Sequence, residues 1–268
     1  MNDMHVGYTS EELAGSPYAR FYNPLMAPLQ KQLGEALQVG PIAPELMYPV
    51  DKAPQMLSGE DWSVESGYAM TPDGAVRAFC LVEMPGVTPA MWDWWFAWHG
   101  SDPMRYRLWH PRAHVHVGWA DGRDDLEHYV GRTSNIVEYL GSELVKLSIS
   151  FITPASMGLD ENILAERGEV AICARVSFSG TPRQTGWLLH HVRPVPGGAQ
   201  MRSRMWVGGN NIAVAGWDGS IGKAIGGLLG RLRKLTSTQA AAVFVHGSQE
   251  MAHLASFLPE LYEEFKSD

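Results

Sequence analysis

Cysteine and clustered positive charge are both scarce in this chain of 268 residues, which contains two Cys and has a formal net charge of −8. Two cysteines are too few for a disulfide framework, so we expect buried free thiols at Cys80 and Cys173 and a reducing, cytoplasmic location. Nucleic-acid binding requires clustered Lys and Arg side chains that displace counterions. Because the sequence has no basic stripe, we expect no DNA or RNA partner.

Long apolar runs and targeting signals are also missing. No stretch approaches the roughly 20 apolar residues of a membrane-spanning helix. The polar start, Met1-Asn2-Asp3-Met4-His5, lacks the basic-then-apolar pattern of a signal peptide. A Gly-x-x-x-x-Gly-Lys loop for polyphosphate binding is absent as well. We therefore expect a soluble protein with a small-molecule ligand and no membrane partner.

Apolar residues, in contrast, make up 45% of the chain, enough for a large core. Residues 1–60 are predicted to form an arm of short helices and irregular Pro-rich loops, with a packing helix from Leu25 to Leu37 where leucines recur at helical spacing. Residues 61–268 are predicted to form the main domain. The arm is expected to pack on this domain or on a second subunit in a homodimer.

The main domain has the pattern of an α+β fold. A hairpin is predicted around Thr71-Pro72-Asp73-Gly74, and further strands are expected at 114–117, 144–152, 169–178, 185–195 and 200–207. Consecutive strands joined by hairpins indicate an antiparallel sheet. Thr88-Pro89 is predicted to start a Trp-rich helix, and Ser237 to cap a final helix interrupted at Pro259. A long helix across a strongly curved sheet would enclose a cavity.

Histidine is the most informative residue type, since nine of the ten His lie between positions 99 and 253. In the strand at 185–195, alternation places His190 on the same face as Leu188 and Val192, and this face is predicted to point inward. His114 and His116 share a strand face in the same way. Taken singly, His114 and His116 are as consistent with a structural role as with a functional one, whereas His190 alone favours a structural role.

The final helix carries His246, Glu250 and His253 at positions i, i+4 and i+7, which places them on one stripe. The flanking residues are strongly apolar, so the stripe is predicted to be buried. Buried ionisable groups require partners or a metal ion. One further acid, Glu138, lies in the Gly-bounded stretch 131–141, which we interpret as a functional loop.

Four motifs resemble the diacetylphloroglucinol hydrolase family, which includes phloretin hydrolases. The motifs are Trp94-Trp-Phe-Ala-Trp-His99, Tyr106-Arg-Leu-Trp-His-Pro111, His190-His-Val-Arg193 with Met201-Arg-Ser-Arg-Met-Trp206, and His246-Gly-Ser-Gln-Glu-Met251 followed by Leu258-Pro-Glu-Leu-Tyr262. The resemblance extends from about Trp92 to Phe265. It implies a helix-grip (Bet v 1-like) fold, with a curved antiparallel sheet, a long C-terminal helix and a small N-terminal helical segment.

The resemblance also implies a zinc-dependent hydrolase that cleaves the carbon–carbon bond between an acyl carbonyl and a phenolic ring in polyphenol degradation. The family's two His and two Glu ligands fall on His110, Glu138, His190 and Glu250. Imidazole and carboxylate suit Zn²⁺. Catalytic roles are assigned to His246, as general acid or base, and to His114.

The implied substrate is an aromatic ketone bound beside the metal. Substrate-binding roles are assigned to His99, Asp102 and Met205. Asp102, Ala113 and Met205 occupy positions where the family has Tyr and Asn, so the pocket is expected to be more apolar. Two alternatives remain open: a metal hydrolase of the same fold acting on another aryl ketone or a diketone, and a non-catalytic carrier of apolar aromatic ligands.

Overall fold

One antiparallel sheet forms the centre of the molecule. The structure is a computed structural model that describes residues 4–125, 127–215 and 234–267. The strands follow one another in the order β1-β2-β8-β7-β6-β5-β4-β3, and β9 pairs with β7. Their bounds are β1 (Gly67–Met70), β2 (Val76–Pro85), β3 (His114–Trp119), β4 (Thr133–Leu140), β5 (Glu143–Ile152), β6 (Val170–Phe178), β7 (Arg183–Val195), β8 (Gly198–Val207) and β9 (Ala213–Val214). The predicted α+β class with a large antiparallel sheet is confirmed, whereas the helix-grip name stays a prediction.

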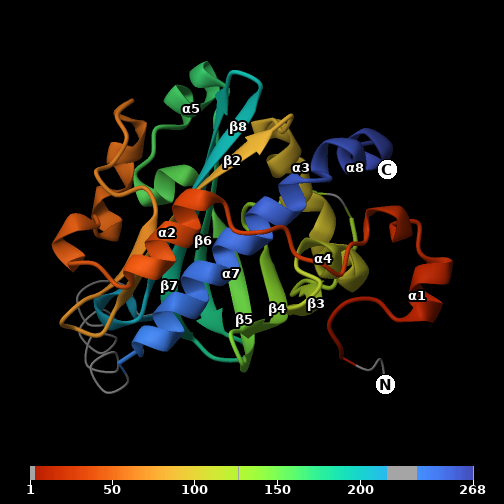
Figure 1. The fold of residues 1–268 in the computed structure, drawn as a ribbon, viewed down its shortest axis with the longest axis horizontal. Coiled ribbons are helices and arrows are strands. Elements are labelled where there is room, and N and C mark those ends of the chain that lie inside the picture. The colour runs from red at the N-terminus through yellow and green to blue at the C-terminus, as the bar shows by residue number, and fades with distance from the viewer. Residues whose placement is uncertain (1–3, 126, 216–233, 268) are drawn as a thin grey trace.

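Helices surround this sheet, and one of them crosses its face. Figure 1 shows α7 running diagonally over the sheet, with α3, α4 and α8 gathered near one end of it. The α-helices are α1 (Ser10–Gly15), α2 (Lys31–Val39), α3 (Pro89–Trp98), α4 (Pro103–Trp109), α5 (Glu161–Arg167), α7 (Ser237–Ala255) and α8 (Leu258–Phe265). Short 3-10 helices are η1 (Ala19–Phe21), η2 (Pro44–Leu46), η3 (Val50–Leu57), η4 (His99–Ser101), η5 (Pro154–Met157) and η6 (Gly209–Asn211). None of the helices in the described ranges is long and apolar enough to span a membrane.

The sequence explains where α7 begins and how closely it approaches the sheet. The Thr236 hydroxyl accepts a hydrogen bond from the Gln239 backbone N–H, and the Gln239 side chain accepts one from the Thr236 N–H, which forms a capping box. Phe244 and Leu254 are fully buried beneath the helix. A Cβ atom at Gly247 would lie 2.7 Å from the Met205 methyl group on β8, so a larger residue here would require the Met205 side chain to shift.

The arm contacts the rest of the molecule through polar groups at several points along its length. Arg107 of α4 forms an ion pair with Glu12, in which a guanidinium nitrogen of Arg107 lies 2.7 Å from Oε1 of Glu12. Farther along, the Ala27 N–H donates to Nδ1 of His253 on α7 at 3.2 Å. These contacts hold the arm on the surface that carries α7. The division at residue 60 and the homodimer stay predictions.

Several local predictions need correction. Glu138 lies on strand β4 and not in a loop. Each face of this strand carries both polar and apolar side chains, so the sequence does not show the two-residue hydrophobic period that indicates a strand. The helix expected over 25–37 begins only at Lys31, as residues 22–30 include two prolines and run along α7. The cap of the final helix is Thr236, one residue before Ser237. Pro259 lies in the first turn of the separate helix α8.

The two faces of the sheet each cover a core. The larger core lies between one face of the sheet and helices α3 and α7. The second core lies between the opposite face and helices η3 and α5. Cys80 and Cys173 are both buried free thiols, as predicted. The second core contains a buried ionic group in which Glu65 accepts hydrogen bonds from Arg202, at 2.6 Å, and from Arg204. Burial opposes ionisation of Glu65, but both guanidinium groups outweigh it and lower the pKa of this carboxyl.

We predict that Glu65→Gln lowers the free energy of unfolding by about 3–5 kcal/mol, because two buried guanidinium groups then lose their counter-ion. The wild-type contribution is present above the pKa of an unfolded glutamate, about 4.3, and is lost as the pH falls below it. Urea unfolding at neutral pH measures the change. Glu60→Gln, at an exposed position, is the matched control. Equal stability of the two variants would contradict the prediction.

Candidate metal centre

Four ionisable side chains from two parts of the fold meet at one point between α7 and the sheet. His114 on β3 and Glu138 on β4 are direct cross-strand partners. His246 and Glu250 lie one helical turn apart on α7. A register shift between His114 and His116 interrupts the β3 pairing at this place. The strand pair and the helix therefore each contribute one imidazole and one carboxylate.

The donor atoms of these side chains are close enough to share one cation. Nε2 of His114 lies 3.4 Å from Nε2 of His246, 3.6 Å from Oε2 of Glu138 and 3.3 Å from Oε2 of Glu250. Nε2 of His246 lies 3.7 Å from the Glu138 oxygen and 3.5 Å from the Glu250 oxygen. The group of His114, Glu138 and His246 satisfies the spacing of a metal site among the described residues. We call these three residues and Glu250 the His-Glu cluster.

Burial makes the cluster electrostatically dependent on positive charge. All four side chains are at most about one-tenth exposed. Burial lowers the pKa of His114 well below its ordinary value and raises that of Glu250. For His246, burial lowers the pKa, but the Glu138 and Glu250 carboxylates outweigh this effect and raise it to about 9. Two buried carboxylates thus require a cation, either an imidazolium or a metal ion.

The geometry of the cluster fits zinc. Zinc bonds to nitrogen and oxygen of about 2.0–2.2 Å in a tetrahedral arrangement place neighbouring ligand atoms roughly 3.3–3.6 Å apart. The five distances given above lie between 3.3 and 3.7 Å, and His114, Glu138 and His246 are the three residues that meet the spacing of a metal site. The donor set of imidazole and carboxylate is also one that zinc accepts. The residues present therefore suit a single divalent ion.

Neighbouring groups orient the cluster. Nδ1 of His114 donates to the Tyr106 carbonyl at 3.0 Å, which leaves the Nε2 lone pair facing the other three residues. The Tyr106 ring stacks on the His114 ring with centroids 3.8 Å apart, and its hydroxyl donates to Oε2 of Glu138 at 2.5 Å. His246 forms a hydrogen bond with the Tyr139 backbone. Tyr106 thus fixes a histidine and a glutamate at once.

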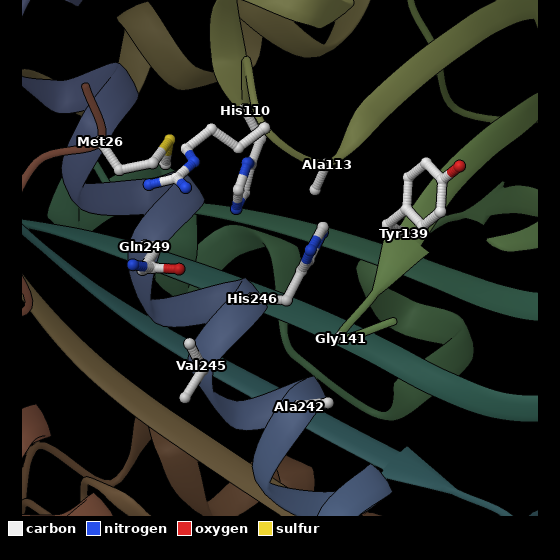
Figure 2. A pocket seen from close by; sticks show the side chains of 10 residues that line it. Met26, His110, Ala113, Tyr139, Gly141, Ala242, Val245, His246 and Gln249 are labelled. Atoms are coloured by element: carbon white, nitrogen blue, oxygen red, sulfur yellow. The ribbon is translucent and has the colours of Figure 1, made fainter. Parts of the chain in front are cut away.

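A pocket of about 230 Å³ reaches the cluster from the surface. Figure 2 shows His246 and His110 facing each other across it, with Gln249 and Val245 on the α7 side. Tyr139 and Gly141 border it on the strand side, and Met26 of the arm lies at its rim. The pocket connects solvent to the His246 imidazole, so a small molecule can reach the cluster along it.

The structure places the predicted metal ligands in different environments. Glu138 and Glu250 are in the cluster. His110 lies beside it, with its ring stacked 5.0 Å from that of His246 and a pKa lowered to about 3, chiefly by burial. His190 points inward, as expected, but it bonds to the Ser203 hydroxyl at 2.8 Å and packs on Phe96. Burial alone lowers the pKa of His190 to about 3, so no carboxylate of the cluster acts on it.

Some of the predicted catalytic and substrate-binding residues lie in the cluster, and others lie outside it. His114 and His246, assigned catalytic roles, are both in the cluster. Met205 lies beneath α7 against Gly247, the residue that follows His246. His99 is buried in the core, where Nδ1 donates to the Trp95 carbonyl at 2.7 Å, and Asp102 caps α4 by accepting from the Met104 N–H at 2.8 Å. The substrate-binding roles of His99, Asp102 and Met205 stay predictions.

Two features of the site were not recognised from the sequence. Tyr106 lies within one of the four motifs, but its position in the sequence gives no sign that it orients His114, eight residues later. His114 was not considered as a ligand, because its pairing with Glu138 depends on strand register. Within the cluster, only the proximity of His246 and Glu250 can be inferred from local sequence, because they lie one turn apart on the same helix.

Comparisons with known proteins agree with the resemblance seen in the motifs. The family model described as the DAPG hydrolase PhiG domain matches residues 47–263. The chain belongs to the DAPG hydrolase family. A 2,4-diacetylphloroglucinol hydrolase from a Pseudomonas species is 34% identical, and the match covers 93% of this chain and 88% of the relative. The Phloretin hydrolase of Eubacterium ramulus is 32% identical, with 97% and 94% covered.

A second 2,4-diacetylphloroglucinol hydrolase, from Pseudomonas protegens, is 33% identical over 93% of this chain and 84% of its own length. Membership of the DAPG hydrolase family and the prediction of a hydrolase are thereby confirmed. A possible metal site is present, whereas the identity of the metal, the ligand roles of single residues and the cytoplasmic location stay predictions.

The two possible ligand sets differ at histidine, and this difference can be tested. We predict that His114→Ala loses the bound metal, because His114 supplies a nitrogen to the His-Glu cluster. His190→Ala, the matched control, is expected to retain about one ion per chain, since His190 bonds to Ser203 instead. Elemental analysis of both purified variants decides between the sets. Metal lost from His190→Ala and kept by His114→Ala would restore the set deduced from the motifs.

Proposed function

We propose that this chain is a zinc-dependent hydrolase that cleaves the carbon–carbon bond between an acyl carbonyl and a phenolic ring. The single observation that carries this proposal is the buried His-Glu cluster at the inner end of a pocket. The relatives are named as hydrolases of 2,4-diacetylphloroglucinol and phloretin, which are both acylated polyphenols. An acylphloroglucinol-type ketone is therefore the proposed substrate class.

The reaction adds the elements of water across the broken bond. The acyl carbon gains the hydroxyl oxygen and leaves as a carboxylic acid. The aryl carbon keeps the bonding electron pair and takes up a proton, which restores a phenol. Hydroxyl groups ortho and para to this carbon allow its protonation before the bond breaks, because the ring then becomes a dienone that accepts the electron pair.

His114, His246 and Glu138 would hold the metal, and Glu250 would lie beside it. When bound, zinc supplies a Lewis acid for the acyl carbonyl oxygen and lowers the pKa of water towards neutrality. We assign His246 to this ligand set in place of its expected role as general acid or base, because its Nε2 faces the three other donors.

The two glutamates have different surroundings, and this suggests different roles. Tyr106 holds Glu138 through a short hydrogen bond, whereas no neutral side chain in the described part of the protein donates to Glu250. We propose that Glu250 is the carboxylate that takes the proton from the attacking water and passes it on to the aryl carbon. Glu138, held by Tyr106, keeps its position throughout.

The proposal predicts turnover of both relatives' substrates. Zinc-loaded protein is expected to cleave 2,4-diacetylphloroglucinol or phloretin, and in ¹⁸O-labelled water to place one labelled oxygen in the released carboxylate. Mass spectrometry of the products measures this, and a chelator is expected to abolish it. Stoichiometric zinc without cleavage of either compound would require another ketone substrate. Absence of bound metal would favour a ligand carrier.

We further predict that Tyr106→Phe reduces kcat/KM by about 10- to 100-fold, because loss of the hydroxyl frees Glu138 and weakens the metal site. Tyr129→Phe is the matched control, since the Tyr129 hydroxyl donates to Asp93 at 2.8 Å, away from the cluster. Steady-state kinetics and metal affinity are measured for both variants. Equal effects of the two substitutions would contradict the role of Tyr106.

A further inference from the structure

The outer part of the pocket contains polar side chains that have no partner within the protein. Arg112 and Gln249 both line it, and neither forms a hydrogen bond or ion pair with any residue in the described ranges. Nδ1 of His110 is buried there and also lacks a partner. Three groups able to donate hydrogen bonds thus line a single pocket beside the His-Glu cluster.

The positions of these residues follow from the elements that build the cluster. Arg112 lies in the short link between α4 and β3, two residues before His114. Gln249 follows His246 by three residues on α7, so both point to the same side of the helix. The elements that place the cluster therefore also place Arg112 and Gln249 along the path to it.

Charge makes this arrangement specific for an anion. The chain as a whole has a net charge of −8, which repels anions. No carboxylate is among the described residues that line the pocket, so the Arg112 guanidinium is not neutralised there. Other arginines near the site are paired, for example Arg105 with Asp102 and Arg107 with Glu12. An unpaired guanidinium is well suited to bind a carboxylate or phenolate oxygen.

We propose that Arg112, assisted by Gln249, forms a subsite for an anionic oxygen of the ligand at the mouth of the pocket. This inference rests on the proposed function, because hydrolysis of an acylphenol creates a carboxylate and its substrate carries acidic phenols. The oxygen belongs either to the phenolate of the entering substrate or to the carboxylate of the leaving acid. Both sources share the chemistry that Arg112 recognises.

Arg112→Met tests the subsite, because it keeps the length of the side chain and removes the charge. The probes are 3-(4-hydroxyphenyl)propanoate, the acid that phloretin hydrolysis releases, and the corresponding neutral amide. Calorimetry on zinc-loaded protein is expected to show about tenfold weaker binding of the acid to Arg112→Met, with binding of the amide unchanged. Rising salt is expected to weaken binding of the acid to the wild type more than to the variant.

Steady-state kinetics with phloretin distinguishes the two sources. A KM raised about tenfold in Arg112→Met, with kcat unchanged, assigns the subsite to the substrate phenolate. An unchanged KM with weaker binding of the acid assigns it to the product. Arg123→Met removes the same charge from an exposed loop outside the pocket and is expected to change neither quantity.

Binding of the acid and KM both unchanged in Arg112→Met would overturn the subsite. This result is distinct from failure of the proposed function, which shows as a zinc-loaded wild type that cleaves neither substrate. In that case, the comparison of acid with amide still tests the subsite, because it requires binding and no turnover.

Discussion

The placement of two buried carboxylates around the same pair of imidazoles is the constraint on which the rest of the site depends. Glu138 comes from the sheet and Glu250 from α7, and both face the same two imidazoles. In a buried environment, two such charges strongly disfavour each other unless a cation lies between them. When α7 packs on the β3–β4 pair, the negative charge of Glu138 and Glu250 must therefore be neutralised by a cation within the site.

Packing elsewhere stabilises this approach. Phe244 and Leu254 of α7 are fully buried against the sheet, and each such side chain contributes about 1.5–3 kcal/mol when it leaves water. Gly247 lets the helix lie directly on Met205, one residue from His246. The apolar helix thus holds His246 and Glu250 in place even though the charges they carry oppose burial. On the sheet side, Tyr106 holds His114 and Glu138 in place through its carbonyl and its hydroxyl, respectively.

The fold was largely predictable, because strand alternation and turn residues are local signals. The hairpins, the Trp-rich helix and the buried stripe on α7 all follow from spacing along the chain. Glu138 was misplaced in a loop because its strand has polar residues on both faces, so that hydrophobic periodicity gives no signal there. The sequence therefore predicts elements best where one face alone is apolar.

The site was only partly predictable for a different reason. His246 and Glu250 are neighbours on one helix, and their convergence follows from helical geometry alone. The choice between His110 and His114 depends on which of them lies opposite Glu138, and that is a property of strand register. His190 has the inward orientation expected of a ligand, yet two strands, β6 and β5, separate its strand β7 from β4 in the sheet.

The electrostatics of the cluster allow its negative charge to be balanced either by a proton or by a metal ion. The Glu138 and Glu250 carboxylates raise the pKa of His246 to about 9, so that at neutral pH a protonated His246 can neutralise part of their charge. A metal ion must displace this proton, since only an unprotonated Nε2 can act as a ligand. Proton and metal thus compete for the same position, and either cation relieves the repulsion between the two glutamates. The side chains that could hold a divalent ion are therefore already partly neutralised when His246 is protonated.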